Sequence, residues 1–121
     1  MAVSDSLPGV VIRITVNNQA LPEYVDQHHT DDEHTVTRYI EAVSDQTFAV
    51  AITLLPTFQF KGDAVEFKVE TDGVLVSRKL LQRQQIGYTF VTQGRVSGED
   101  QIEKFQFAGL QTGTSVHAVN R

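Results

Sequence analysis

The segment VEFKVETDGVLV, residues 65–76, constrains the fold of this chain most strongly. Apolar and charged residues alternate over residues 65–70, and three further β-formers follow the dipeptide Asp72-Gly73. A period of two indicates a strand with one buried face, and the glycine allows the positive φ that a tight reversal needs. The segment therefore predicts a β-hairpin, with Glu66 and Glu70 on its solvent face.

The same alternation recurs along the chain, and only LQRQQIG, residues 81–87, suits a short helix. We expect residues 35–43 and 48–55 to pair as a hairpin, with 48–55 buried on both faces, and residues 56–64 and 93–100 to be connections. The pattern predicts an all-β fold, a single antiparallel β-sandwich that is jelly-roll-like, with seven or eight strands and little helix. The other expected strands are VVIRITV (10–16), YTFVT (88–92) and IEKFQFAGL (102–110).

The length of 121 residues predicts one domain over residues 1–121. A polar acidic loop is expected at 23–34, and a flexible tail or a last edge strand from about residue 111. The chain has no cysteine, no apolar run long enough to span a membrane and no basic region before its first apolar residues. We therefore expect an intracellular protein, cytoplasmic or nuclear.

The net charge of −5 is distributed unevenly. Residues 1–70 hold eleven acids against four bases (−7), and residues 71–121 hold four acids against six bases (+2). Binding to nucleic acid needs a basic footprint, which this chain lacks. The charge distribution favours a basic protein partner, or a homo-oligomer in which unlike ends meet.

The stretch DQHHTDDEHT, residues 26–35, is the most unusual in composition. Imidazoles and carboxylates suit a metal ion, but all of these candidates lie on one loop without regular structure to fix them. We expect a solvated loop and no metal or cofactor, with an acidic surface for a partner as the functional alternative. Its candidate partner-binding residues are Asp31, Asp32, Glu33 and His34.

Two further groups are candidates for contact with a partner. Phe58 and Phe60 follow Pro56 in an expected loop, and an exposed pair there would form a binding patch. The basic residues are Arg78, Lys79 and Arg83. They either protect an edge strand or contact the acidic loop of another copy, and we favour protection of the edge.

Four motifs together resemble a domain family of filamentous fungi, which usually stands at the N-terminus of proteins and is labelled as a domain of unknown function. The resemblance covers most of the chain and implies a fungal source, a non-enzymatic role and a folded head of a longer protein. The motifs are LPGVVIRI, RYIEA after the acidic loop, FKGDAVEFKV and EKFQFAGL.

The residues nominate no catalytic group, because the chain has no nucleophile elbow, no cysteine and no phosphate-binding loop. We expect a non-catalytic module for protein interaction or oligomerisation, in which the acidic loop steers a basic ligand. One alternative is an acidic chaperone domain of the nucleoplasmin type, which binds basic proteins. Another alternative is a carbohydrate-binding β-sandwich, which would need exposed aromatic residues with polar neighbours.

Overall fold

The computed structural model describes residues 2–4, 7–25, 35–43, 45–71, 73–98, 101–106 and 114–120. These residues form twelve strands and one 3-10 turn, and they contain no α-helix. The elements are β1 (Ala2–Ser4), β2 (Leu7–Val16), β3 (Gln19–Ala20), β4 (Glu23–Tyr24), β5 (Tyr39–Ile40), β6 (Thr47–Leu54), β7 (Ala64–Thr71), β8 (Val74–Gln82), η1 (Arg83–Gln85), β9 (Thr89–Thr92), β10 (Gly94–Gly98), β11 (Gln101–Gln106) and β12 (Thr114–Asn120).

Strand β6 is the centre of the larger sheet. It pairs with β2 along one edge, and β9 and β11 share its other edge. Phe48, Val50, Ile52 and Leu54 are buried on one face, and Ala51 is buried on the other. A central strand covered in this way needs apolar residues on both faces, as the sequence predicted.

The smaller sheet has the order β12-β7-β8. Its β7–β8 pair is the hairpin predicted from the alternation, and Gly73 in its turn has a φ of 81°. Strand β12 pairs with β7 from Thr114 to Asn120, so these residues form the edge strand that was the alternative to a tail.

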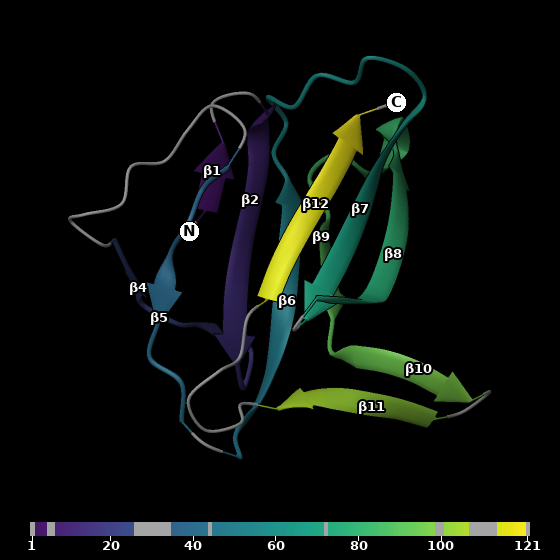
Figure 1. Cartoon of the computed structure of the whole chain (residues 1–121). Coiled ribbons are helices and arrows are strands. Elements are labelled where there is room, and N and C mark those ends of the chain that lie inside the picture. Colours follow the sequence, from purple (N-terminus) through teal and green to yellow (C-terminus); the bar gives the residue numbers. More distant parts are fainter. Residues whose placement is uncertain are drawn as a thin grey trace.

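The core lies between the two sheets. Val50, Ile52 and Leu54 of β6, together with Val65, Phe67 and Val69 of β7, are the largest fully buried side chains and belong to one cluster. Figure 1 shows the smaller sheet in front of β2, β6 and β9, with the β4–β5 ribbon at one end of the molecule and β8 at the other. The prediction of an antiparallel all-β fold is confirmed, and the two sheets face each other without closing into a barrel.

The hairpin predicted between residues 35–43 and 48–55 is wrong. Within residues 35–43 only Tyr39–Ile40 form a strand, and this strand pairs with Glu23–Tyr24 as a two-stranded sheet. The reason is that both edges of β6 are occupied by strands distant in sequence, β2 on one side and β9 with β11 on the other. Local alternation could not reveal that competition.

Residues 93–100 were also predicted to be a simple connection, and most of them form a strand. Gly94–Gly98 pair with β11 in a second hairpin. Two glycines interrupt the alternation there, yet a ladder is made by backbone groups and tolerates them at a cost in stability. The short helix expected over residues 81–87 is the single 3-10 turn η1.

Candidate functional site

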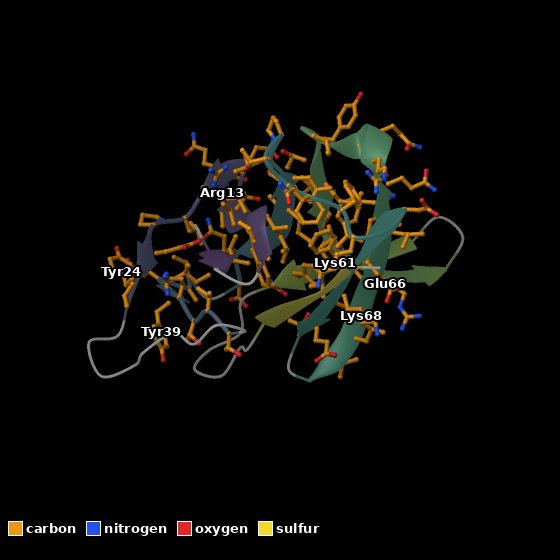
Figure 2. The ribbon with its side chains drawn as sticks, turned by 90° about the horizontal axis from the view of Figure 1, so that it is seen from above. Arg13, Tyr24, Tyr39, Lys61, Glu66 and Lys68 are labelled. Carbon is orange, nitrogen blue, oxygen red and sulfur yellow. The ribbon has the colours of Figure 1, made fainter. Side chains whose placement is uncertain are left out.

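Two tyrosines face each other on the β4–β5 ribbon. Tyr24 lies directly opposite Tyr39 in the ladder, and the two side chains are 55% and 49% exposed. Directly paired residues of an antiparallel ladder share one face and lie close together. Figure 2 shows both tyrosines at the end of the molecule remote from Lys61, Glu66 and Lys68. We call this pair the tyrosine platform.

The platform is held in place by its neighbours on the core side. A two-residue ladder is marginal by itself, but Leu21 and Ile40 pack against the core cluster. The Leu21 N–H also donates a hydrogen bond of 2.9 Å to the Ile14 carbonyl, which ties the ribbon to β2. The backbone that carries the two tyrosines is thus anchored on its core side, and both side chains are exposed.

Phenylalanine and tyrosine side chains differ in their exposure to solvent. Every phenylalanine in the described part of the chain is buried or half-buried, whereas Tyr24, Tyr39 and Tyr88 are all exposed. A tyrosine tolerates water at its hydroxyl and still presents an apolar ring. Tyr88, 66% exposed, lies between η1 and β9, where its carbonyl accepts a hydrogen bond from the Leu54 N–H, and it is not part of the β4–β5 ladder. The platform is therefore distinct from a lone surface tyrosine.

The acidic stretch that connects β4 to β5 lies outside the described residues. Its predicted contact residues Asp31, Asp32, Glu33 and His34 all fall there, as do the other histidines of the stretch. In sequence, residues 26–34 carry four carboxylates, and the Tyr24–Tyr39 pairing brings the two ends of that connection together. The platform therefore stands where the most acidic part of the chain begins and ends.

The three predicted basic residues do not form one cluster. Arg78 is exposed and lies opposite Lys68 on the outer face of the smaller sheet. Lys79 lies opposite Phe67, on the core side, and its ammonium nitrogen is 5.1 Å from the centre of the Phe90 ring. This separation follows from strand geometry, because neighbouring residues of a strand point to opposite faces.

Arg83 is the first residue of η1, directly after the end of β8. Its guanidinium carbon is 5.6 Å from the centre of the Phe60 ring, which in turn meets Phe58 edge-to-face at 4.9 Å between ring centres. Such cation–π contacts contribute about 0.5–1 kcal/mol at exposed sites. Arg83 therefore covers an aromatic pair, and it remains exposed itself.

The Phe58–Phe60 patch considered from the sequence is not an exposed pair. Phe58 is only 4% exposed and belongs to the core cluster, and Phe60 is half-buried against it. The loop returns to the core because the Phe58 N–H donates to the Leu55 carbonyl and the Leu55 N–H donates to the Gly9 carbonyl. Phe58 is thus a core residue rather than a contact residue.

Glu66 also departs from its predicted position on a solvent face. It is 8% exposed, and one of its carboxylate oxygens lies 3.7 Å from the ammonium nitrogen of Lys68. Since β7 is the central strand of its sheet, a side chain on its outer face has neighbours on both sides, and a paired charge is tolerated there. Glu66 therefore contributes to the structure of the sheet.

The described residues contain no candidate metal site and no candidate membrane-spanning helix. No three histidine, cysteine or carboxylate side chains among them lie close enough together to hold a metal ion. No helix in that part of the chain is long and apolar enough to cross a membrane.

Comparison with known families gives one match. Residues 9–120 match the model of a domain of unknown function, DUF7918. The chain belongs to this family. The match covers the chain from Gly9 in β2 to the last residue of β12, so the smaller sheet, the tyrosine platform and all of the larger sheet except β1 and the first two residues of β2 are part of the DUF7918 domain. No curated protein and no solved structure matches the chain.

Sequence reasoning missed the platform of this DUF7918 domain. Tyr24 was assigned to the acidic loop and Tyr39 to a strand of another hairpin, so the two were never placed together. The available signal was weak: each tyrosine adjoins a β-branched residue, Val25 or Ile40, at either end of an acidic run. Short β-formers that bracket a polar stretch can indicate a ribbon that closes it.

Proposed function

We propose that this DUF7918 domain is a non-catalytic protein-interaction module that binds a basic, arginine-bearing segment at the tyrosine platform. The observation that carries the proposal is the exposed, in-register pair of Tyr24 and Tyr39. Large exposed aromatic side chains grouped together are typical of interaction surfaces.

The chemistry of the platform favours a guanidinium group. A planar arginine side chain stacks on a tyrosine ring, and a lysine ammonium does so less effectively. The carboxylates in the sequence between the two tyrosines add a long-range attraction for cations, which raises the rate of encounter. Charge would bring a basic segment to this end of the molecule, and the rings would select arginine.

The same proposal includes the setting of the domain. We propose that it is the folded head of a longer fungal protein and works inside the cell, in the cytoplasm or the nucleus. Support for this setting comes from the motifs that resemble a fungal N-terminal family and from the acidic, cysteine-free composition. Self-association through unlike charges stays part of the proposal.

A carbohydrate ligand is the second candidate, because an exposed aromatic pair also suits a sugar ring. The platform supplies the two exposed rings. This candidate depends on ring stacking alone, so it predicts no preference for basic peptides.

Two peptides of equal length and charge test the proposal. One consists of Arg-Gly-Gly repeats, and the other has lysine in place of each arginine. If the rings contribute as proposed, the arginine peptide binds about 5- to 30-fold more tightly in calorimetry, corresponding to about 1–2 kcal/mol for two cation–π contacts.

Two variants locate that preference. Tyr24→Ala and Tyr39→Ala together should remove it, and Tyr88→Ala is the matched control because Tyr88 is also an exposed tyrosine but lies outside the platform. Equal affinity of both peptides for the unmodified domain would reduce the interaction to charge alone, as expected for an acidic chaperone. Binding of neither peptide, with binding of soluble oligosaccharides, would favour the carbohydrate candidate.

A further inference from the structure

Strand β8 is an edge strand of the smaller sheet, and its charged side chains are all basic. It closes the order β12-β7-β8, and among the described strands it pairs only with β7. Strand β10 comes close to β8 but forms no ladder with it. Figure 1 shows β8 at the outer side of the smaller sheet, at the opposite end of the molecule from the platform. An edge strand presents unpaired backbone N–H and C=O groups to a partner.

The charge around this edge differs from that of the rest of the chain. In a chain with net charge −5, residues 73–98 contain no acid, and their four bases are Arg78, Lys79, Arg83 and Arg95. Like charges directly opposite each other on paired strands are unfavourable. A second copy of β8 is therefore a poor partner for this edge, because its own Arg78 and Lys79 would face these cations.

Apolar residues complete the surface. Leu80 and Leu75 are exposed on the outer face, where they lie opposite Glu66 and Glu70 of β7. Arg78 stands between them on the same face, and a bulge at Val76 separates it from Leu75. The regular part of the edge therefore runs from Ser77 to Gln82, with two cations followed by two leucines.

The register defines the complementary strand. Every ladder of the described structure is antiparallel, so we consider a partner strand that runs against β8. Directly opposite residues contribute most to cross-strand energy. Acids opposite Arg78 and Lys79, and β-branched residues opposite Leu80 and Leu81, satisfy the charge and the packing together.

We propose that the β8 edge between Ser77 and Gln82 is a docking site for an extended acidic segment of a partner protein, which adds to the smaller sheet as a fourth, antiparallel strand. The cations that prevent unsuitable pairing at this edge would then select the correct strand, so that one set of charges serves both purposes. This site goes beyond the proposed function, because it lies at the other end of the molecule and takes a ligand of opposite charge.

The test uses the peptide acetyl-Thr-Ile-Val-Glu-Glu-Thr-amide at millimolar concentration with the isotope-labelled 121-residue domain. The expected result is a set of NMR shifts in the backbone amides of residues 77–82, together with slower hydrogen exchange in that strand. Two peptide controls accompany it: one with both glutamates replaced by lysine, and one methylated at alternate backbone nitrogens. Neither control should bind, the first because of charge and the second because it cannot complete a ladder.

A charge reversal provides the second arm. Arg78→Glu changes an exposed side chain and should weaken binding of the acidic peptide by about tenfold or more, because it replaces one attractive cross-strand pair by a repulsive one. Absence of shifts at residues 77–82 with the acidic peptide would overturn the proposal and leave these cations as protection of the edge. Binding that survives backbone methylation would also overturn it, since charge attraction without a ladder is not strand addition.

Discussion

Gly9 is the residue at which backbone conformation and core packing depend most directly on each other. Its φ is 91°, a region that other residues rarely adopt, and a Cβ placed on it would lie 2.7 Å from the backbone N and Cα atoms of Phe58. The start of β2 can therefore approach the loop after β6 only with glycine at this position. That approach keeps Phe58 in the core.

Gly9→Ala should destabilise the domain by about 2–5 kcal/mol, because it combines a strained φ with a steric clash against backbone atoms. Gly73→Ala is the matched control: Gly73 has a φ of 81° but no atom within 4 Å of its Cβ position, so only the strain of about 1–2 kcal/mol applies. Urea denaturation of both variants measures the difference. Equal losses of unfolding free energy in the two variants would show that the close approach to Phe58 does not contribute to stability.

Phe58→Ala tests whether this side chain is a core residue. Removal of a buried phenylalanine costs about 3–5 kcal/mol in free energy of unfolding. Val91→Ala, at an exposed position of β9, is the control and should change stability by less than about 1 kcal/mol. If Phe58→Ala behaved like the control in urea denaturation, the side chain would have to be exposed, as the sequence had allowed.

Most strands could be predicted from the sequence, but few of their pairing partners could. The β7–β8 hairpin and β6 follow from alternation and turn chemistry, which are local. The β4–β5 ribbon, in contrast, requires Tyr24 to meet Tyr39 across an acidic stretch, and the competition for the edges of β6 decides that pairing. Such competition is a property of the whole chain, so no local pattern reveals it.

The same distinction explains which site residues could be predicted. The basic residues were found by composition, but alternation along β8 sends Arg78 outward and Lys79 toward Phe90. Phe58 was judged from its place after a proline, and a hydrogen-bonded return to Gly9 buries it. The sequence therefore shows which chemical groups these residues carry, but it does not show whether their side chains point to solvent or to the core.

Strand β12 is the element with the clearest experimental consequence. A chain that ends at Gly113 loses the whole ladder with β7 and uncovers one edge of the strand that carries Val65 and Phe67. We expect its melting temperature to fall by about 10 °C or more in thermal unfolding followed by circular dichroism. Removal of Arg121 alone is the control, and a shortened chain that melts like this control would mean that residues 114–120 behave as a tail.

At the scale of the whole molecule, two candidate surfaces of opposite character lie at opposite ends of an open β-sandwich. The tyrosine platform adjoins the most acidic part of the sequence, and the β8 edge belongs to a stretch of 26 residues, 73–98, without an acid. A domain of this kind can hold two partners at once or join copies through unlike ends. We propose that such an arrangement serves assembly.

Salt should separate the two contributions at the platform. Raised ionic strength screens the carboxylates of residues 26–34 and weakens binding of both the arginine and the lysine peptide. The ratio between the two affinities should persist, because ring stacking is short-ranged and less screened. Calorimetry at low and high salt measures that ratio, and a ratio that approaches one at high salt would assign the preference for arginine to charge.

NMR mapping of the arginine peptide decides whether the tyrosine platform is an interaction surface. We expect the largest shifts in the backbone amides of Tyr24 and Tyr39 and in their ring protons, with Tyr88 and residues 77–82 unchanged. Shifts spread over the surface without a maximum at these two tyrosines would contradict the claim, and so would a maximum elsewhere in the domain.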